Sequence, residues 1–383
     1  MLIKRLNLKK ILSFNDATVE LGQLNVLIGP NAVGKTNLIE VISLLQAAPT
    51  SGRLVATILN GGGIRQWLWL GDLAASSPLT TPIATIECDV TLRRVRPVGP
   101  LEYRLKFSEE PTGFVILDEQ LTKSSRGTGN GRRRPYFTRG PLGATLQKTE
   151  SVLARLKNPI DTTPITEVGN HFEEIRIYRE FRTGRGSGAR SGVPTIVAKD
   201  ALQDGGDNLA LVLQELDFRG RHELVRSYLL RFCERFDDVK IEIANGLARA
   251  FLLETGLVEM LSSIRTSDGT LKFLALLAAL FHPKPPPLMC IEEPELGLHP
   301  DSMQLVAEAL VEASQSMQLI VTTHSDALID ALTDRPESVL VCDRDFDNGT
   351  QMKRLSKTHL KEWLKHYSLG ELWRKGEIGG GRW

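Results

Sequence analysis

The sequence of 383 residues has few cysteines, no long apolar run and almost no excess of charge. Its four cysteines, at positions 88, 233, 290 and 342, lie far apart and form no C-x-x-C pair, so neither a zinc site nor a disulfide framework is expected. Each falls in an apolar segment, which favours small core residues in a reducing compartment. The net charge of +1 means that any affinity for nucleic acid has to come from local patches.

No apolar run approaches the roughly twenty residues that a membrane helix needs. The N-terminus begins on an alternating pattern, with Leu2, Ile3, Leu6 and Leu8, rather than on a signal peptide. The hydrophobic content of 42% and charged content of 24% are typical of a globular protein with ample apolar surface for a core. We therefore expect a cytoplasmic protein without a membrane partner.

A glycine-bounded loop lies between an apolar strand and a helix-like repeat in the stretch LNVLIGPNAVGKTNLIEVISLL. The pattern G-x-x-x-x-G-K-S/T is met by Gly29, Gly34, Lys35 and Thr36, and residues 24–28 read as the buried strand that precedes it. Backbone N–H groups at such a helix start, together with the helix dipole, form a seat for phosphate oxygens.

The residues of this loop predict a nucleotide site. Lys35 can reach the outer phosphates as a point charge, and the Thr36 hydroxyl can ligate a magnesium ion. We expect a bound nucleotide and Mg²⁺, with the nucleotide held by Gly29, Pro30, Asn31, Ala32, Val33, Gly34, Lys35, Thr36 and Asn37.

Acidic residues end a second apolar strand, at residues 288–291. Ligands collect at the carboxyl ends of parallel strands, and successive side chains there point in different directions. We assign Glu292 to the magnesium ion, usually through water, and Glu293 to the attacking water as orienting group or base. His324 ends the next strand, in IVTTHS, where a neutral imidazole can respond to the γ-phosphate.

The order of the segments predicts an α/β P-loop fold. Residues 1–50 form an N-terminal lobe with the phosphate loop, and residues 261–383 form a C-terminal lobe of alternating strands and helices with a mostly parallel sheet. Residues 51–260 form an insertion with antiparallel strands in ATIECDVTL, EYRLKF and FVILDEQL. The glycine- and arginine-rich segments SSRGTGNGRRRPYFTRG and RTGRGSGARSG are expected to be exposed loops of this insertion.

The ordered set GPNAVGKT, SDGT, IEEPELGLHP and TTHS resembles the ATPase heads of the ABC/SMC/RecF/OLD group, most closely the AAA-21 type. The resemblance covers about the first fifty residues and everything from Ser262 onward. It implies that Ser267, Asp268 and Gly269 form the signature turn, which caps the ATP held by a partner copy, so that a homodimer forms around two ATP molecules. The turn is also an N-cap for the helix that follows.

Two positions depart from the pattern of the group. Glu292 stands where most relatives have Asp, which lengthens its reach to the metal by one methylene, and Ala32 replaces the glycine common in the SMC-type loop. We assign no metal-sensing glutamine, since Gln46 and Gln66 both fit weakly.

The segment CDRDFDNG has acids at alternate positions, as a calcium loop does. Counted from Asp343 as the first position of such a loop, the sixth position is Asn348 rather than Gly and the twelfth is Arg354 rather than Glu, so a hairpin turn is the better interpretation.

The resemblance implies an ATPase that acts as an ATP-dependent dimerising switch in DNA repair, recombination or anti-phage defence. Local phosphate contacts to double-stranded DNA are offered by Arg132, Arg133, Arg134, Arg139, Arg182, Arg185 and Arg190. Glycine- and arginine-rich loops are as often simply solvated, so these residues leave the DNA contact open. The alternative is a protein-interaction regulator that controls a separately encoded effector protein without touching DNA. A transporter subunit is disfavoured by the long insertion.

Overall fold

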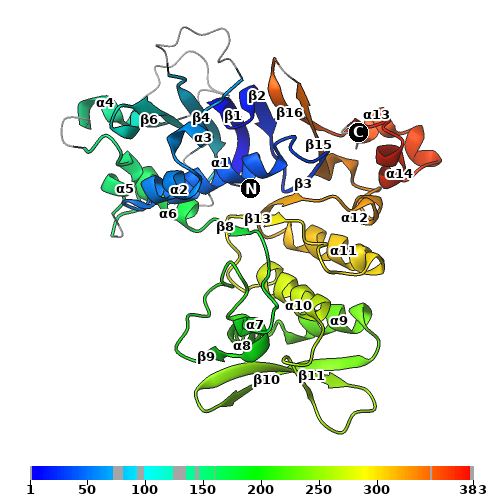
Figure 1. The fold of residues 1–383 in the computed structure, drawn as a ribbon. Coiled ribbons are helices and arrows are strands. Elements are labelled where there is room, and N and C mark those ends of the chain that lie inside the picture. The colour runs from blue at the N-terminus through cyan, green and yellow to red at the C-terminus, as the bar shows by residue number, and fades with distance from the viewer. Residues whose placement is uncertain are drawn as a thin grey trace. The chain divides into compact units, whose positions relative to one another are not determined.

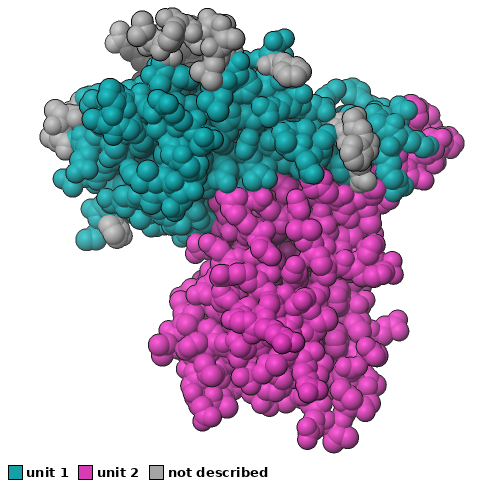
Figure 2. Space-filling model, in the orientation of Figure 1, with its two compact units in different colours: residues 1–175, 337–361, 373–383 teal, residues 176–336, 362–372 magenta. Residues whose placement is uncertain are grey.

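The computed structural model describes residues 2–71, 81–92, 99–123, 135–142, 146–158, 160–345 and 347–379. Its contacts divide the chain into two compact units, which Figure 2 colours separately. Unit 1 comprises residues 1–175, 337–361 and 373–383, and unit 2 comprises residues 176–336 and 362–372. The antiparallel strands of the predicted insertion thus belong to the same unit as the phosphate loop.

Unit 1 is built on a mixed sheet that carries the phosphate loop (Figure 1). Its strands follow the order β7-β6-β5-β4-β1-β2-β16-β15-β3. They are β1 (Ile3–Ile11), β2 (Phe14–Glu20), β3 (Leu24–Ile28), β4 (Ala84–Val90), β5 (Leu101–Glu110), β6 (Gly113–Lys123), β7 (Pro135–Thr138), β15 (Val339–Asp345) and β16 (Gly349–Arg354). The predicted antiparallel strands are confirmed as β4, β5 and β6, and β3 runs parallel to β15.

The helices of unit 1 include the one that the phosphate loop feeds. They are α1 (Lys35–Ala47), α2 (Arg53–Asn60), α3 (Ile64–Trp67), α4 (Arg139–Leu142), α5 (Val152–Leu156), α6 (Pro164–Glu173) and α13 (Lys357–Leu360). All five residues of β3 are buried, and α1 buries Leu38, Ile42 and Leu45 at helical spacing. The apolar pattern therefore fixes both elements that flank the loop.

Unit 2 combines a parallel sheet, β14-β13-β8, with a small antiparallel sheet, β10-β11-β12, whose strand β11 also pairs with β9 (Figure 1). The strands are β8 (Arg176–Tyr178), β9 (Val193–Pro194), β10 (Phe236–Ala244), β11 (Leu247–Glu254), β12 (Leu261–Ser262), β13 (Leu288–Glu292) and β14 (Gln318–Thr322). The mostly parallel core predicted for the C-terminal segment is confirmed here, since β13 runs parallel to both neighbours.

The helices of unit 2 pack mainly as a layer around α10. They are α7 (Gly188–Ser191), α8 (Leu209–Phe218), α9 (His222–Phe232), α10 (Asp268–Leu280), α11 (Met303–Ala313) and α12 (Asp326–Asp330), with 3₁₀ turns at Pro300–Ser302 and Trp363–Lys365. A third 3₁₀ turn (Pro336–Ser338) and helix α14 (Leu369–Arg374) straddle the division between the units. Helix α10 is almost wholly buried from Thr270 onward, and Phe273 stacks on Phe232 with ring centroids 4.3 Å apart.

The structure differs from the sequence prediction in both glycine- and arginine-rich segments. Residues 135–138 form β7 because they pair with β6, and residues 139–142 form α4. Residues 188–191 form the short helix α7 within the second segment. Residues 124–134 of the first segment, with Arg132 to Arg134, lie outside the described residues.

Three smaller features of the sequence can be followed in the structure. CDRDFDNG lies at a hairpin, since β15 and β16 pair antiparallel. All four cysteines are free, and only the one at position 233 is not fully buried. In the described part of the chain, no helix has the length and apolar character needed to span a membrane.

Candidate functional site

The loop between β3 and α1 requires glycine at both of its ends. Gly29 and Gly34 have positive φ of 146° and 103°. A Cβ on Gly29 would clash with the carbonyl oxygen of Cys342, and one on Gly34 would clash with the hydroxyls of Thr350 and Ser13. The two glycines of the pattern are therefore needed for both backbone angle and close approach.

The Lys35 side chain is held on the loop, with only 6% of the residue exposed. Its Nζ donates to the carbonyl oxygens of Gly29 at 2.7 Å and Pro30 at 2.8 Å. Asn31, Ala32 and Thr36 are exposed, Val33 is buried and Asn37 is half-buried. The loop thus has exposed residues at positions 31, 32 and 36, while the ammonium group of Lys35 is held by loop carbonyl oxygens.

A buried polar cluster beneath the loop was not foreseen from the sequence. Thr350 Oγ1 donates to the carbonyl oxygen of Val33 at 2.6 Å and contacts Ser13 Oγ at 2.7 Å. Asn37 Nδ2 also donates to Ser13 Oγ, at 2.8 Å. Ser13 and Thr350 are 337 positions apart, so no local pattern could have joined them.

Ala32 occupies a left-handed conformation, with φ of 63°. That conformation costs an L-residue with a side chain roughly 1–2 kcal/mol, which explains why related loops favour glycine there. Arg344 Nη1 donates to the Ala32 carbonyl oxygen at 3.3 Å, from the β15 end of the hairpin. The departure at this position therefore strains the loop without removing a functional group.

The carboxyl ends of the three parallel strands of unit 2 place charged side chains side by side. Glu292 ends β13, and its Oε1 accepts a hydrogen bond of 2.6 Å from Nη1 of Arg179, which follows β8. Arg179 is a residue that sequence reasoning missed, because only the pairing of β8 with β13 brings it to Glu292. The Glu292 carboxylate is thus already charge-compensated on one oxygen.

Glu293 and His324 lie next to each other at the same strand ends. Glu293 Oε1 is 3.7 Å from His324 Nε2, and each side chain is 35% exposed. Glu293 has a positive φ of 45°, and its backbone N–H donates to the Thr322 carbonyl oxygen at 2.9 Å. Such strain in a non-glycine residue persists where the surroundings hold it, which is common at functional sites.

Glu295 joins the turn after β13 to the turn after β14. Its Oε1 accepts from Thr323 Oγ1 and from the backbone N–H of His324, both at 2.7 Å. Burial raises the pKa of its carboxyl, although these hydrogen bonds oppose the shift. Glu295 therefore fixes the backbone from which the His324 side chain projects.

The predicted signature turn begins α10. The Ser267 hydroxyl accepts from the backbone N–H of Thr270 at 3.1 Å, which confirms the N-cap. Asp268 is exposed, and the Arg190 guanidinium, at 2.6 Å, lowers the pKa of its carboxyl. Gly269 lies against the carbonyl oxygen of Gly297, where a Cβ would be too close.

The expected phosphate contacts to DNA are wrong for two of the arginines. Arg139 is 6% exposed and donates to the carbonyl oxygens of Glu150 and Gln147. Arg190 is likewise occupied by carbonyl oxygens, whereas the side chain of Arg182 is 64% exposed and pairs with Asp207. Burial of a guanidinium among carbonyl groups supports the fold and leaves it unavailable to an external phosphate.

These residues make two constellations with complementary chemistry. In unit 1, the loop offers backbone N–H groups, an ammonium group and a hydroxyl, which suit phosphate and a hard cation. In unit 2, two carboxylates and an imidazole share one sheet edge, which suits metal ligation and proton transfer from water. Hydroxyl and carboxylate oxygens of this kind are the ligands that Mg²⁺ prefers.

Comparison with known proteins gives matches to one family and to solved structures. The AAA_21 family, described as "AAA domain, putative AbiEii toxin, Type IV TA system", matches residues 24–73 and 221–330. None of the curated proteins matches the sequence at a significant level.

Two solved structures share the fold over nearly the whole chain. One is an SMC head bound to the C-terminal winged-helix domain of ScpA, with a TM-score of 0.55 and 15% identity, covering 94% of this chain and 99% of that one. The other is an SMC head with an extended coiled coil, bound to the C-terminal domain of ScpA from Pyrococcus furiosus, with a TM-score of 0.55 and 14% identity, covering 95% and 98%. The chain therefore has the fold of the SMC heads, and within residues 24–73 and 221–330 it resembles the AAA_21 family.

Proposed function

We propose that the chain binds ATP with Mg²⁺, hydrolyses it, and uses the nucleotide to join two copies of itself. The observation that carries this proposal is the loop between β3 and α1, whose glycines, buried Lys35 and helix start are built for a triphosphate. Because the fold is that of an ATPase head, nucleotide binding is the activity it supports best.

The roles of the loop follow from its chemistry. The backbone N–H groups of residues 31–36 would bind phosphate oxygens, and Lys35 would turn its ammonium group from the loop carbonyls toward the outer phosphates. Thr36 and Glu292 would hold the Mg²⁺, since both offer hard oxygen ligands. The cation supplies neutralisation of the phosphate charge.

The acid at the end of β13 would act on water. Glu293 would accept the proton of the attacking water, and His324, 3.7 Å away, would orient its carboxylate or donate toward the outer phosphate. The positive φ of Glu293 turns its side chain away from the regular direction of β13, so that Glu292 and Glu293 can serve the metal and the water separately.

The signature turn would complete the site of a second copy. Ser267 and the first N–H groups of α10 would cap the ATP held by the partner copy, so that two ATP molecules lie in the homodimer interface. Loss of the outer phosphate would weaken this contact and release the pair.

The process that the switch serves is proposed as DNA repair, recombination or anti-phage defence in the cytoplasm. The second candidate is regulation of a separately encoded effector protein, and the internal bonding of Arg139 and Arg190 favours it, since it removes two of the expected DNA contacts. The solved SMC heads that share this fold are bound to domains of ScpA, so a partner protein also fits this fold.

One set of assays tests the activity and separates the two candidates. The purified chain should release phosphate from ATP only with Mg²⁺, and Lys35→Ala should abolish this release while Lys10→Ala, in β1, does not. Binding to double-stranded DNA that weakens steeply with salt would support the DNA role. Absence of such binding, with turnover that responds to a protein partner, would support the regulator.

A further inference from the structure

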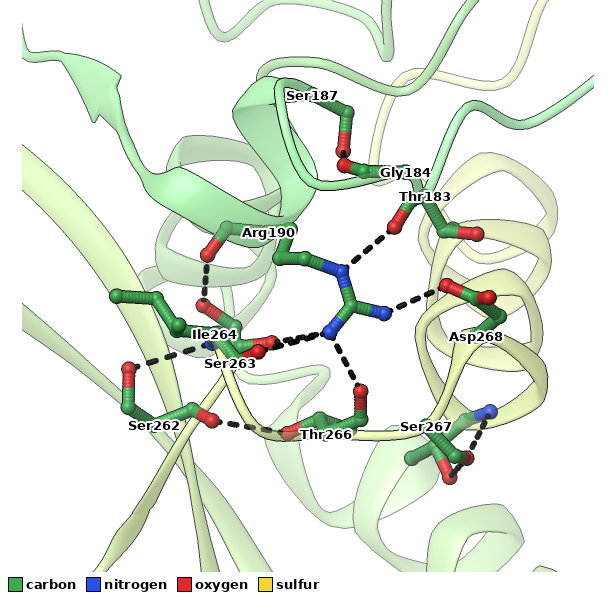
Figure 3. A network of polar contacts seen from close by, with 11 residues as sticks. Thr183, Gly184, Ser187, Arg190, Ser262, Ser263, Ile264, Thr266, Ser267 and Asp268 are labelled. Atoms are coloured by element: carbon green, nitrogen blue, oxygen red, sulfur yellow. Dashed lines mark hydrogen bonds and ion pairs between the residues drawn. The ribbon is translucent and has the colours of Figure 1, made fainter.

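A single arginine joins the loop of residues 183–190 to the turn that leads into α10. Arg190, in α7, donates from Nε to the carbonyl oxygen of Thr183 at 2.7 Å and from Nη1 to those of Ile264 at 2.9 Å and Thr266 at 2.7 Å. Its Nη2 bonds Asp268 Oδ1 at 2.6 Å, and Figure 3 shows the guanidinium at the centre of this network.

The network is anchored from both sides. Ser263 returns a hydrogen bond from its hydroxyl to the Arg190 carbonyl oxygen at 2.7 Å, and Ser263 is 1% exposed. On the other side, Asp207 Oδ1 accepts from the backbone N–H of Gly188 at 3.0 Å, which holds the start of α7. The Arg190 side chain itself is only 11% exposed.

The bonds of Arg190 need the shape of a guanidinium. Its fork directs donors to carbonyl groups on two segments and to one carboxylate at the same time, which the single ammonium group of a lysine cannot do. Removal would leave the carbonyl groups of residues 264 and 266 without this donor, directly before Ser267. The position of Ser267 therefore depends on Arg190 through the backbone.

The side of α10 that carries Asp268 is open. A cavity of about 950 Å³ is lined there by residues 180–188, Asp207, Asp268, Lys272 and Gly297. The turn is thus held by the hydrogen bonds of Arg190, while Asp268 borders an open cavity.

We infer that Arg190 is a positioning residue for the signature turn. It holds the backbone of residues 267–269 in the position from which the turn caps the nucleotide of the partner copy. It contributes nothing to binding of the chain's own nucleotide. This inference rests on the proposed function. It assigns to Arg190 a role in place of the DNA contact expected from the sequence.

The variants are chosen to separate positioning from folding. Arg190→Lys keeps the charge and loses the fork, and Arg190→Gln keeps an amide donor without the charge. The matched control is Arg249→Lys. Arg249 donates from Nε at 3.2 Å and from Nη2 at 3.0 Å to the Ser191 carbonyl oxygen, and within the described residues it makes no hydrogen bond to the signature turn. We expect turnover to fall about 10²-fold in both Arg190 variants, the size of effect seen when a reacting group is misplaced by about 1 Å.

Two measurements, nucleotide binding and ATP-dependent dimerisation, distinguish positioning of the signature turn from a general loss of folding. Binding of a fluorescent ATP analogue by the separate copies should stay within about twofold of wild type, while ATP-dependent dimerisation is lost. The inference is overturned if both Arg190 variants lose nucleotide binding, or if Arg190→Lys keeps wild-type turnover.

Mixed dimers locate the effect. Alone, Arg190→Lys should keep about a hundredth of wild-type turnover and Lys35→Ala should have none. A dimer of one copy of each has one site with both residues intact, so an equal mixture should regain about a quarter of wild-type turnover. A mixture of Ser267→Arg with Lys35→Ala is the reference for a signature turn that acts on the partner. If the reference mixture regains turnover and the Arg190 mixture does not, Arg190 acts on its own nucleotide and only this inference is wrong; if neither does, the proposed dimer site fails as well.

Discussion

Glu293 Oε1 lies 3.7 Å from His324 Nε2, at the adjacent carboxyl ends of the parallel strands β13 and β14. The register of the two strands places Glu292 opposite Thr322, so the residues that follow are brought together by the sheet itself. Glu295 then fixes the backbone at His324. The strand ends thus hold a carboxylate and an imidazole next to each other.

The proximity of the two side chains predicts the effect of removing the imidazole. His324→Ala should lower kcat for ATP hydrolysis about 10²-fold, within the range typical of groups that assist proton transfer. The KM for ATP should change little, because the proposed contacts to the phosphates are made mainly by the loop between β3 and α1. The measurement is steady-state phosphate release over a range of ATP concentrations.

The control for that variant is His299→Ala, since the His299 side chain is 75% exposed and His299 follows β13, whereas His324 follows β14. A His324→Ala protein with wild-type kcat, or an equal loss in His299→Ala, would show that the pair with Glu293 has no part in hydrolysis.

The ion pair between Arg179 and Glu292 predicts a change in metal dependence. The guanidinium competes with a cation for the carboxylate, because both favour its ionised form. Arg179→Ala should therefore lower the Mg²⁺ concentration that gives half-maximal turnover, and Arg235→Ala, an exposed control, should leave it unchanged. An unchanged or higher Mg²⁺ requirement in Arg179→Ala would contradict the assignment of Glu292 to the metal.

Glu119, fully buried in unit 1, predicts a pH-dependent stability. It accepts hydrogen bonds from Tyr103, Ser151 and the backbone N–H of Val152, at 2.7–3.0 Å. Burial raises the pKa of its carboxyl above the ordinary value. At pH values between the ordinary pKa of a glutamate and the raised pKa of Glu119 in the folded protein, the folded protein keeps the proton and the unfolded chain loses it. The contribution of Glu119 to the free energy of unfolding therefore falls as pH rises.

The check is urea unfolding of wild type and Glu119→Gln over a series of pH values. The free energy of unfolding of wild type should decline relative to that of Glu119→Gln as pH rises above the ordinary range of a glutamate. Glu119→Ala should lose about 3 kcal/mol because several buried donors lose their acceptor. Parallel pH curves for wild type and Glu119→Gln would refute the raised pKa.

The sequence predicts the fold where its signals are local. The apolar run before Gly29 and the helical repeat after Thr36 place β3 and α1 within a residue or two of their observed bounds, because both elements bury a continuous apolar face. The strands that precede Glu293 and His324 are found for the same reason. The roles assigned to those residues stay predictions.

Contacts between segments that lie far apart in the sequence could not be predicted. Nothing near Ser13 or Thr350 indicates that both support the phosphate loop, and Arg179 reaches Glu292 only through strand pairing. Composition was misleading for Arg139 and Arg190, since glycine and arginine suggest solvated loops. A guanidinium has enough donors to satisfy several carbonyl groups, which allows it to be buried without a matching number of acids.

The central claim is that Lys35 and Glu293 serve one nucleotide, and the oligomeric mass of two variants tests it most directly. Glu293→Gln should bind ATP without hydrolysing it and should dimerise when ATP and Mg²⁺ are added, whereas Glu293→Gln combined with Lys35→Ala should keep its nucleotide-free mass. A Glu293→Gln protein whose mass does not change with ATP and Mg²⁺, or a double variant that dimerises equally well, would contradict the account.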